Sequence, residues 1–213
     1  MPRVRLAHLP TPLEPLPHLS RKLNGPRIWI KRDDCTGLAL GGNKTRHLEF
    51  VLGQALQRGA DTLVWGADVQ SNNGRQTAAA CAKLGLNCHL VLSTMVRPAL
   101  PQGNLLLDLL LGATVEYTTE PLGEGLWERI RRASRRLEQS GHKVFSVVDP
   151  VTLPAASLSY IEAAIELDAQ VRSAGLNPAA IYVASGGPTG AGLMAARKLM
   201  GLPWQLHNVL PIQ

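Results

Sequence analysis

The stretch from which the organisation of this 213-residue chain can best be predicted is Gly41-Gly42-Asn43-Lys44-Thr45-Arg46. Two glycines stand before a lysine, and the lysine stands at the expected start of a helix. Two further polar loops also lie at expected helix starts: Gln70-Ser71-Asn72-Asn73 and Ser185-Gly186-Gly187-Pro188-Thr189-Gly190. Loops of this kind that follow a strand gather at one edge of a parallel sheet, where α/β proteins bind ligands.

Apolar periodicity extends this pattern along the chain. Short apolar runs predict strands over 27–31, 62–65, 89–92, 114–117, 144–148, 181–184 and 205–210. Between most of them, amphipathic runs predict helices over 44–58, 72–84, 104–111, 125–139, 158–172 and 191–200. The alternation predicts an α/β fold with two lobes, in which parallel sheets are flanked by helices.

Lys44 is the first candidate for chemistry. A cation in the first turn of a helix opposes the helix dipole, at a cost of about 0.3–1 kcal/mol, so its position calls for a reason. The positive end of the helix, together with burial, would lower the lysine pKa and favour the free amine. A free amine is what condensation with a carbonyl group requires. The alternative is an exposed lysine that extends from a loop into water.

The two other loops supply polar groups. The Ser185–Gly190 loop offers backbone N–H groups to an anion, helped by the Ser185 and Thr189 hydroxyls, although Pro188 removes one N–H. Ser71, Asn72 and Asn73 are more polar groups than one helix cap needs. The three loops together suggest a site for a phosphorylated cofactor that forms a Schiff base. An ordinary turn and an ordinary cap are the alternatives for the two loops.

Composition excludes several classes of protein. The net charge is +6, and much of the local excess lies on one expected helix, at Arg129, Arg131, Arg132, Arg135 and Arg136. We interpret that cluster as a solvated helix face, because only 4% of the residues are aromatic, and we expect no nucleic-acid partner. No apolar run reaches the length of a membrane helix, and no secretory signal is visible, so we expect no membrane partner.

Cysteine, histidine and glycine patterns exclude further classes. Three cysteines indicate a reducing, cytoplasmic location, and the six histidines form no paired motif, so we assign no metal. A phosphate-binding loop of the nucleotide-hydrolase type is also excluded. Asn43 is inserted between Gly42 and Lys44, where that motif requires the lysine to follow directly.

Several of these motifs occur together in one known family. Ile30–Asp34, Gly41–Glu49, Gln70–Asn72, Arg75–Ala79 and Ala82–Leu86 jointly resemble the D-cysteine desulfhydrase and 1-aminocyclopropane-1-carboxylate deaminase family. The likeness runs from about residue 11 to residue 204 and is strongest over the first ninety residues. The Gly103–Asp108 segment leans toward the desulfhydrase branch. The family consists of pyridoxal-phosphate enzymes with the tryptophan-synthase-β-like fold.

The resemblance implies roles for residues and a reaction. Lys44 would be the Schiff-base lysine and the acid/base at the substrate α-carbon, and Asn72 would hold the 3′ oxygen of pyridoxal 5′-phosphate. Ser71 and Asn73 would meet the substrate carboxylate, with Ser71 also taking part in proton transfer. Ser185, Gly186, Gly187 and Thr189 would hold the phosphate. The implied reaction is β-elimination from a small amino acid such as D-cysteine, giving pyruvate, ammonia and sulfide, or a related deamination of 1-aminocyclopropane-1-carboxylate.

The resemblance also predicts a division into lobes. Residues 1–46 would begin the large lobe, 47–150 would form the small lobe, and 151–213 would continue the large lobe with the phosphate loop. Family members are considerably longer and usually form homodimers. We therefore expect a truncated member with an incomplete large lobe, and an inactive remnant that acts through binding is the alternative to an active enzyme.

Overall fold

A four-stranded parallel sheet forms the core of one half of the molecule. The computed structural model describes residues 1–96 and 100–210. The strands β3 (Thr62–Asp68), β4 (Asn87–Ser93), β5 (Thr114–Thr118) and β6 (Val144–Ser146) lie in the order β5-β4-β3-β6. The two central strands are apolar on both faces, because helices cover both sides of the sheet.

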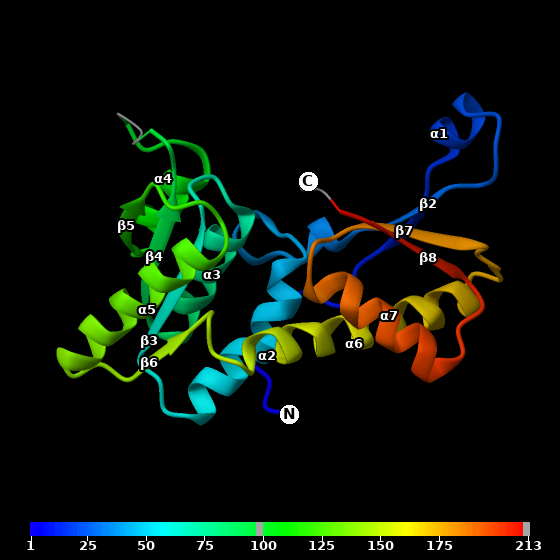
Figure 1. Ribbon diagram of the computed structural model, residues 1–213. Coiled ribbons are helices and arrows are strands. Elements are labelled where there is room, and N and C mark those ends of the chain that lie inside the picture. Colours follow the sequence, from blue (N-terminus) through cyan, green and yellow to red (C-terminus); the bar gives the residue numbers. More distant parts are fainter. Residues whose placement is uncertain (97–99, 211–213) are drawn as a thin grey trace.

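Helices pack on the two faces of this sheet (Figure 1). On one face, α5 (Glu124–Gln139) places Leu126 and Ile130 against Val64 of β3. A Cβ at Gly66 would lie only 2.3 Å from Ile130 Cδ1, so this strand position requires a glycine. On the other face, α2 (Lys44–Gln57) and α3 (Asn72–Leu84) enclose the largest apolar cluster, and α4 (Gly103–Leu110) packs on α3.

The second half of the molecule is built from two packed helices and a parallel strand pair. The helices α6 (Thr152–Ser173) and α7 (Pro188–Met200) pack along each other, beside β7 (Ala180–Ala184) and β8 (Gln205–Val209). Gly192 allows this close approach, because a Cβ there would lie 2.3 Å from Ser157 O. The α2 helix packs on both α3 and α6, so it joins the two halves (Figure 1).

The N-terminal segment wraps onto this framework. An antiparallel pair, β1 (Leu13–Pro15) and β2 (Trp29–Lys31), flanks the short helix α1 (Pro17–Lys22), and two 3-10 turns follow, η1 (Asp33–Cys35) and η2 (Leu38–Leu40). Glu49 of α2 ties down the first residues, because its Oε1 accepts from the N–H groups of Leu6 and Ala7 at 2.8 Å each.

The predicted α/β fold with parallel sheets is confirmed, and the differences lie at the ends of elements and in the N-terminal segment. The α6 helix begins at Thr152 rather than at residue 158, and α7 begins at Pro188 rather than at 191. Pro154 and Pro188 both lie in a first helical turn, where the missing N–H would have no partner in any case. The proline-rich N-terminal segment gave no periodic signal, so β1 and α1 were not predicted.

The predicted arginine cluster lies on an exposed face of α5. Arg131 pairs with Glu124 at 2.6 Å, Arg132 with Glu128 at 3.2 Å, and Arg136 reaches Glu116 of β5 at 2.7 Å. Acidic partners thus offset much of the cluster's charge. None of the helices within residues 1–96 and 100–210 combines the length and the hydrophobicity needed to cross a bilayer.

Candidate active site

Lys44 is the first residue of α2, as the sequence predicted. The preceding residue, Asn43, makes no side-chain cap, and the first turn contains no acidic residue. The side chain is partly buried, and this burial lowers the pKa of the Lys44 amine. Burial, one of the two causes expected from sequence, therefore shifts Lys44 toward the free amine.

The turn before Lys44 has a backbone that only glycine adopts readily. Gly41 and Gly42 have φ values of 75° and 130°. A Cβ at Gly41 would lie 1.9 Å from Asp34 O, and a Cβ at Gly42 would lie 2.4 Å from Gln76 Nε2. The Thr36 hydroxyl fixes the turn further by accepting from Gly42 N at 2.9 Å and donating to Gly42 O at 2.8 Å. Lys44 thus stands on a closely packed, well-defined turn.

The structure brings the third loop to the start of α2. Thr189 Oγ1 accepts from Asn43 Nδ2 at 3.3 Å and lies 3.0 Å from Nε2 of His47. Asn43 and His47 flank Lys44 on α2, and both Thr189 and His47 are buried. Burial, with the nearby charge of Lys44, lowers the pKa of His47 to about 3, so this imidazole is neutral near pH 7. Two loops that are about 145 residues apart therefore share one hydrogen-bonded contact.

Ser185 shapes the third loop from inside. Its Oγ accepts from the N–H groups of Gly187 at 3.2 Å and Gly190 at 3.1 Å, and its side chain is buried. A Cβ at Gly186 or Gly187 would meet no atom within 4 Å, so the loop's outer surface is open. Among the described residues, the N–H groups of Gly186 and Thr189 have no acceptor. These two donors and the open surface fit a phosphate group.

Two details of this loop bear on the predicted anion site. Pro188 offers no N–H, and it is the first helical residue of α7, where its φ suits the helix start. The hydroxyls of Ser185 and Thr189 were expected to face the phosphate. The structure uses both hydroxyls in contacts within the protein, which leaves the backbone N–H groups, also part of the prediction, as the free donors.

The second loop caps α3 in the ordinary way. Ser71 is the N-cap residue, and its Oγ accepts from Asn73 N at 3.1 Å, so capping accounts for one of the three polar residues. Asn72 is exposed, and its Oδ1 accepts from Asn104 Nδ2 at 3.1 Å. The Asn72 Nδ2 group has no partner among the described residues, so it is free to donate to a ligand.

Gln76 joins this second loop to the turn that carries Lys44. Its Oε1 accepts from Thr45 N at 2.8 Å and from Thr45 Oγ1 at 2.9 Å, while its Nε2 donates to Asn72 O at 3.0 Å. Gln76 is fully buried, so these bonds are protected from water. The starts of α2 and α3 are therefore held in a fixed relation.

His47, Gln76 and Asn104 were not among the site residues predicted from the sequence. His47 lies three residues after Lys44 and Gln76 four after Asn72, spacings that place each pair on one helix face. That spacing was the available signal for both. Asn104 gave no such signal, because its contacts cross from α4 to the loop before α3.

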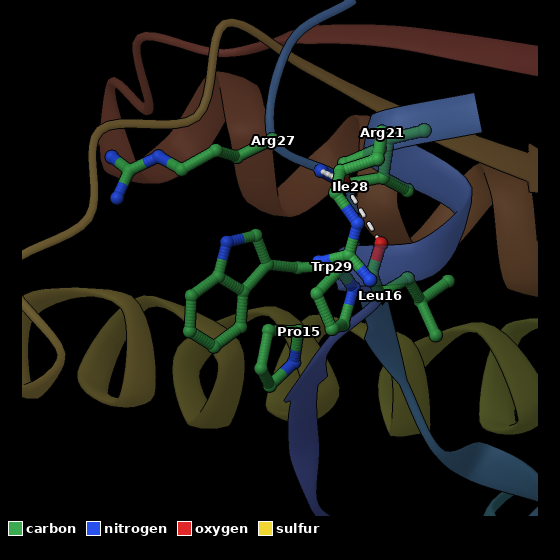
Figure 2. Close-up of a pocket in the computed structure, with 8 residues that line it drawn as sticks. Pro15, Leu16, Arg21, Arg27, Ile28 and Trp29 are labelled. Atoms are coloured by element: carbon green, nitrogen blue, oxygen red, sulfur yellow. Dashed lines mark hydrogen bonds between the residues drawn. The ribbon is translucent and has the colours of Figure 1, made fainter. Parts of the chain in front are cut away.

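A separate apolar pocket lies in the N-terminal segment (Figure 2). Its volume is about 250 Å³, and its lining includes Pro15, Leu16, Arg27 and Trp29, which Figure 2 labels. None of the predicted site residues lines it. This pocket is therefore separate from the lysine and its two loops.

Comparison with known proteins assigns the chain to a family. Residues 4–209 match the family model described as pyridoxal-phosphate dependent enzyme, and the chain belongs to that family. It is 41% identical over 200 residues to a D-cysteine desulfhydrase of Klebsiella pneumoniae, covering 90% of this chain and 59% of that protein. A D-cysteine desulfhydrase of Salmonella paratyphi B is 39% identical with the same coverage.

Solved structures agree with this assignment. The crystal structure of an ACC deaminase homologue superposes with a TM-score of 0.86 at 34% identity, covering 95% of this chain and 61% of that one. Diaminopropionate ammonia lyase of Escherichia coli shares the fold, with a TM-score of 0.73 at 21% identity over 95% of this chain and 58% of the other. The chain thus spans about three fifths of the length of these relatives.

Proposed function

We propose that this chain carries the Schiff-base lysine and phosphate loop of a lyase that removes sulfide and ammonia from D-cysteine or a similar small amino acid, giving pyruvate. One observation carries the proposal. Lys44, an amine with a lowered pKa, stands between a loop with free N–H donors and a loop with a free amide donor. Hydrogen bonds through Thr189 and Gln76 tie both loops to the turn that carries Lys44.

The residues present fit pyridoxal 5′-phosphate. Lys44 would attach to its carbonyl, the N–H groups of Gly186 and Thr189 would hold the phosphate, and Asn72 would donate to the 3′ oxygen. When bound, the cofactor acidifies the α-proton of an attached amino acid by withdrawing electrons from that carbon. Lys44 would then accept this proton through its amine, and burial favours the free amine by lowering the pKa of Lys44.

Substrate recognition is assigned to the second loop. We propose that Ser71 and Asn73 hold the substrate carboxylate through hydroxyl and amide donors, and that Ser71 also moves a proton. Asn73 N already donates to Ser71 Oγ, which leaves the Ser71 hydroxyl hydrogen available to a carboxylate. Deamination of 1-aminocyclopropane-1-carboxylate is the second candidate reaction, favoured by the similarity to the ACC deaminase homologue.

We also propose a cytoplasmic location and a homodimer as the working form. The location is supported by Cys35, Cys81 and Cys88, which are all free thiols in the structure. If cell fractionation found no protein in the cytoplasmic fraction, the proposed location would be contradicted. Sedimentation of the purified protein as a monomer at micromolar concentration would contradict the dimer.

The test is replacement of Lys44. Purified protein would be incubated with pyridoxal 5′-phosphate and treated with borohydride, and peptide masses would locate the attached cofactor. We expect attachment at Lys44 in the natural chain and none in Lys44→Ala, because the alanine has no amine. Lys83→Ala is the matched control, since Lys83 is an exposed lysine of α3.

The reaction products would then be measured for the natural chain and for the same variants. We expect sulfide and pyruvate from D-cysteine to fall by at least about 1,000-fold in Lys44→Ala, since the base and the attachment are lost together. Ammonia released from 1-aminocyclopropane-1-carboxylate, with no sulfide from D-cysteine, would favour the second reaction. Equal activity in Lys44→Ala and the natural chain would refute both.

A further inference from the structure

The start of α4 is bonded to the loop that carries Asn72. Asn104, the second residue of α4, donates from its backbone N to Gln70 Oε1 at 2.9 Å. Its Nδ2 donates to Gln70 O at 2.7 Å and to Asn72 Oδ1 at 3.1 Å. Gln70 Nε2 in turn donates to Gln102 O at 3.1 Å. Four hydrogen bonds therefore connect two loops that are about 32 residues apart in sequence.

These bonds fix which end of each amide faces which partner. A side-chain amide has two N–H donors, and both donors of Asn104 are used, one by Gln70 O and one by Asn72 Oδ1. Rotating the Asn104 amide by 180° would set its oxygen against two other oxygens, which is unfavourable. The Asn72 amide is fixed in turn, with its oxygen toward Asn104 and its nitrogen toward the remaining side.

The orientation of the Asn72 amide matters for the cofactor oxygen that Asn72 would contact. The phenolic oxygen of pyridoxal 5′-phosphate is an acceptor when ionised, and an N–H donor stabilises that ionised form. The amide oxygen of Asn72 in the same place would repel it. The Asn72 backbone is held separately by Gln76, so the orientation of the side-chain amide depends on Asn104 alone among the described residues.

We propose that Asn104 is a positioning residue that orients the Asn72 amide to donate to the cofactor's phenolic oxygen. The inference rests on the proposed function, since it requires the cofactor at Lys44. Gly103 allows the start of α4 to lie close to Gln70, because a Cβ at Gly103 would lie only 2.5 Å from Gln70 Oε1. Asn104 itself does not touch the cofactor in this proposal. It acts only through the direction of Asn72.

The main test is Asn104→Asp, which keeps the shape of the side chain but replaces its donating nitrogen with an accepting oxygen. The introduced carboxylate would repel Asn72 Oδ1 and favour the rotated Asn72 amide. We expect the dissociation constant for pyridoxal 5′-phosphate to rise about 10- to 100-fold, the range for losing a hydrogen bond to a charged group. We also expect the visible absorbance of the bound cofactor to titrate at higher pH, since its ionised oxygen loses a donor.

Two further variants separate this role from a general loss of structure. Asn104→Ala removes the donors without adding charge, and we expect a rise in the dissociation constant in the same direction but smaller. Asn87→Asp is the control for charge, because Asn87 is an exposed residue at the first position of β4. We expect it to change neither the dissociation constant nor the pH titration of the cofactor. Circular dichroism would confirm that each variant is folded.

A double substitution gives the sharpest outcome. If Asn104 acts through Asn72, then Asn104→Asp added to Asn72→Ala should change cofactor affinity no further than Asn72→Ala alone. Full additivity of the two losses would overturn the inference, as would an Asn104→Asp protein with natural affinity and a natural pH titration. Absence of borohydride-stable attachment at Lys44 in the natural chain would instead overturn the proposed function.

Discussion

Gly41 is the residue at which the turn before Lys44 tolerates the least change. Its φ of 75° disfavours any side chain, and the atom that a Cβ would meet is the backbone oxygen of Asp34, 1.9 Å away. A backbone atom cannot rotate aside as a flexible side chain can. The position of Lys44 therefore depends on the absence of one methyl group at a residue shortly before it.

Gly41→Ala is expected to lower the free energy of unfolding by at least about 2–4 kcal/mol, combining left-handed strain with the clash. Gly59→Ala is the matched control, because Gly59 has a φ of 70° but open space where a Cβ would lie. It should cost only about 1–2 kcal/mol, the strain alone. Urea unfolding would measure both, and equal losses would show that the Asp34 contact is unimportant.

At the scale of residues, the sequence predicted which residues lie at helix starts but not the residues with which they form hydrogen bonds. Lys44, Asn72 and Thr189 were found because each follows a local signal of glycines or polar caps. The contacts of Asn72 with Asn104 and of Thr189 with His47 depend on how distant segments meet in the fold. Local patterns carry no information about such contacts. The backbone donors of the phosphate loop were therefore predicted, but the use of the Ser185 and Thr189 hydroxyls within the protein was not.

At the scale of elements, α4 carries a carboxylate in an unfavourable place. Asp108 is buried against α3, and its Oδ1 has no hydrogen-bond partner among the described residues. Burial raises the pKa of Asp108 to about 6, and the nearby charge of Arg75 only partly offsets this. A carboxyl group whose pKa is raised by folding makes its full contribution to the stability of the protein below about pH 3.9. That contribution is lost as the pH rises through 6.

Asp108→Asn should therefore stabilise the protein at pH 8, by roughly 1–3 kcal/mol after allowance for screening by water. The gain should shrink toward pH 4, where the natural carboxyl is protonated in the folded state. Asp168→Asn is the control and should give no gain, because the partly exposed Asp168 of α6 is already paired with Arg172. Chemical unfolding across this pH range would decide, and a loss of stability at pH 8 would contradict the expectation.

Element boundaries show where sequence patterns were sufficient. The α3 helix runs over Asn72–Leu84 as predicted, because Ser71 caps one end and Gly85 adopts the left-handed conformation at the other. The α6 helix was predicted to start at residue 158, six residues later than its start at Thr152 in the structure, and Pro154 lies in the stretch between. Helices end at a proline only when it lies beyond the first turn, and Pro154 lies within it.

At the scale of the whole molecule, a buried ionic network joins distant segments. The almost fully buried guanidinium of Arg46 in α2 lies 2.9 Å from Asp33 and 2.8 Å from Glu166 of α6. Lys31 of β2 also pairs with Glu166. Burial alone would raise the pKa of Glu166, but hydrogen bonds from Arg46 and Lys31 outweigh it and lower the pKa to about 2. Three parts of the chain thus meet at one carboxylate.

Glu166→Gln should destabilise the protein at pH 7 by roughly 1–3 kcal/mol after screening is allowed for. A carboxylate with a lowered pKa contributes fully above about pH 4.3 and loses that contribution as the pH falls through 2. The gap between variant and natural chain should therefore narrow from pH 5 to pH 3. Glu162→Gln, which breaks only the exposed pair with Arg3, should cost less than about 1 kcal/mol.

The same variant tests how the chain divides. We propose lobes of residues 1–46 with 151–213, and of 47–150, because the network binds the first segment to α6. Hydrogen exchange of Glu166→Gln should then rise in residues 1–46 and 151–213 together. Equal increases within the four-stranded sheet would contradict this division.

The contact of Thr189 with Asn43 and His47 has a consequence for affinity. It sets the distance between the amine of Lys44 and the N–H donors near Gly186 before any ligand arrives. Under the proposed assignment, a ligand anchored at one end presents its other end at an effective concentration of about millimolar or above. Two individually weak attachments would then multiply into tight retention, as in a chelate, and a ligand that lacks the phosphate would lose that multiplication.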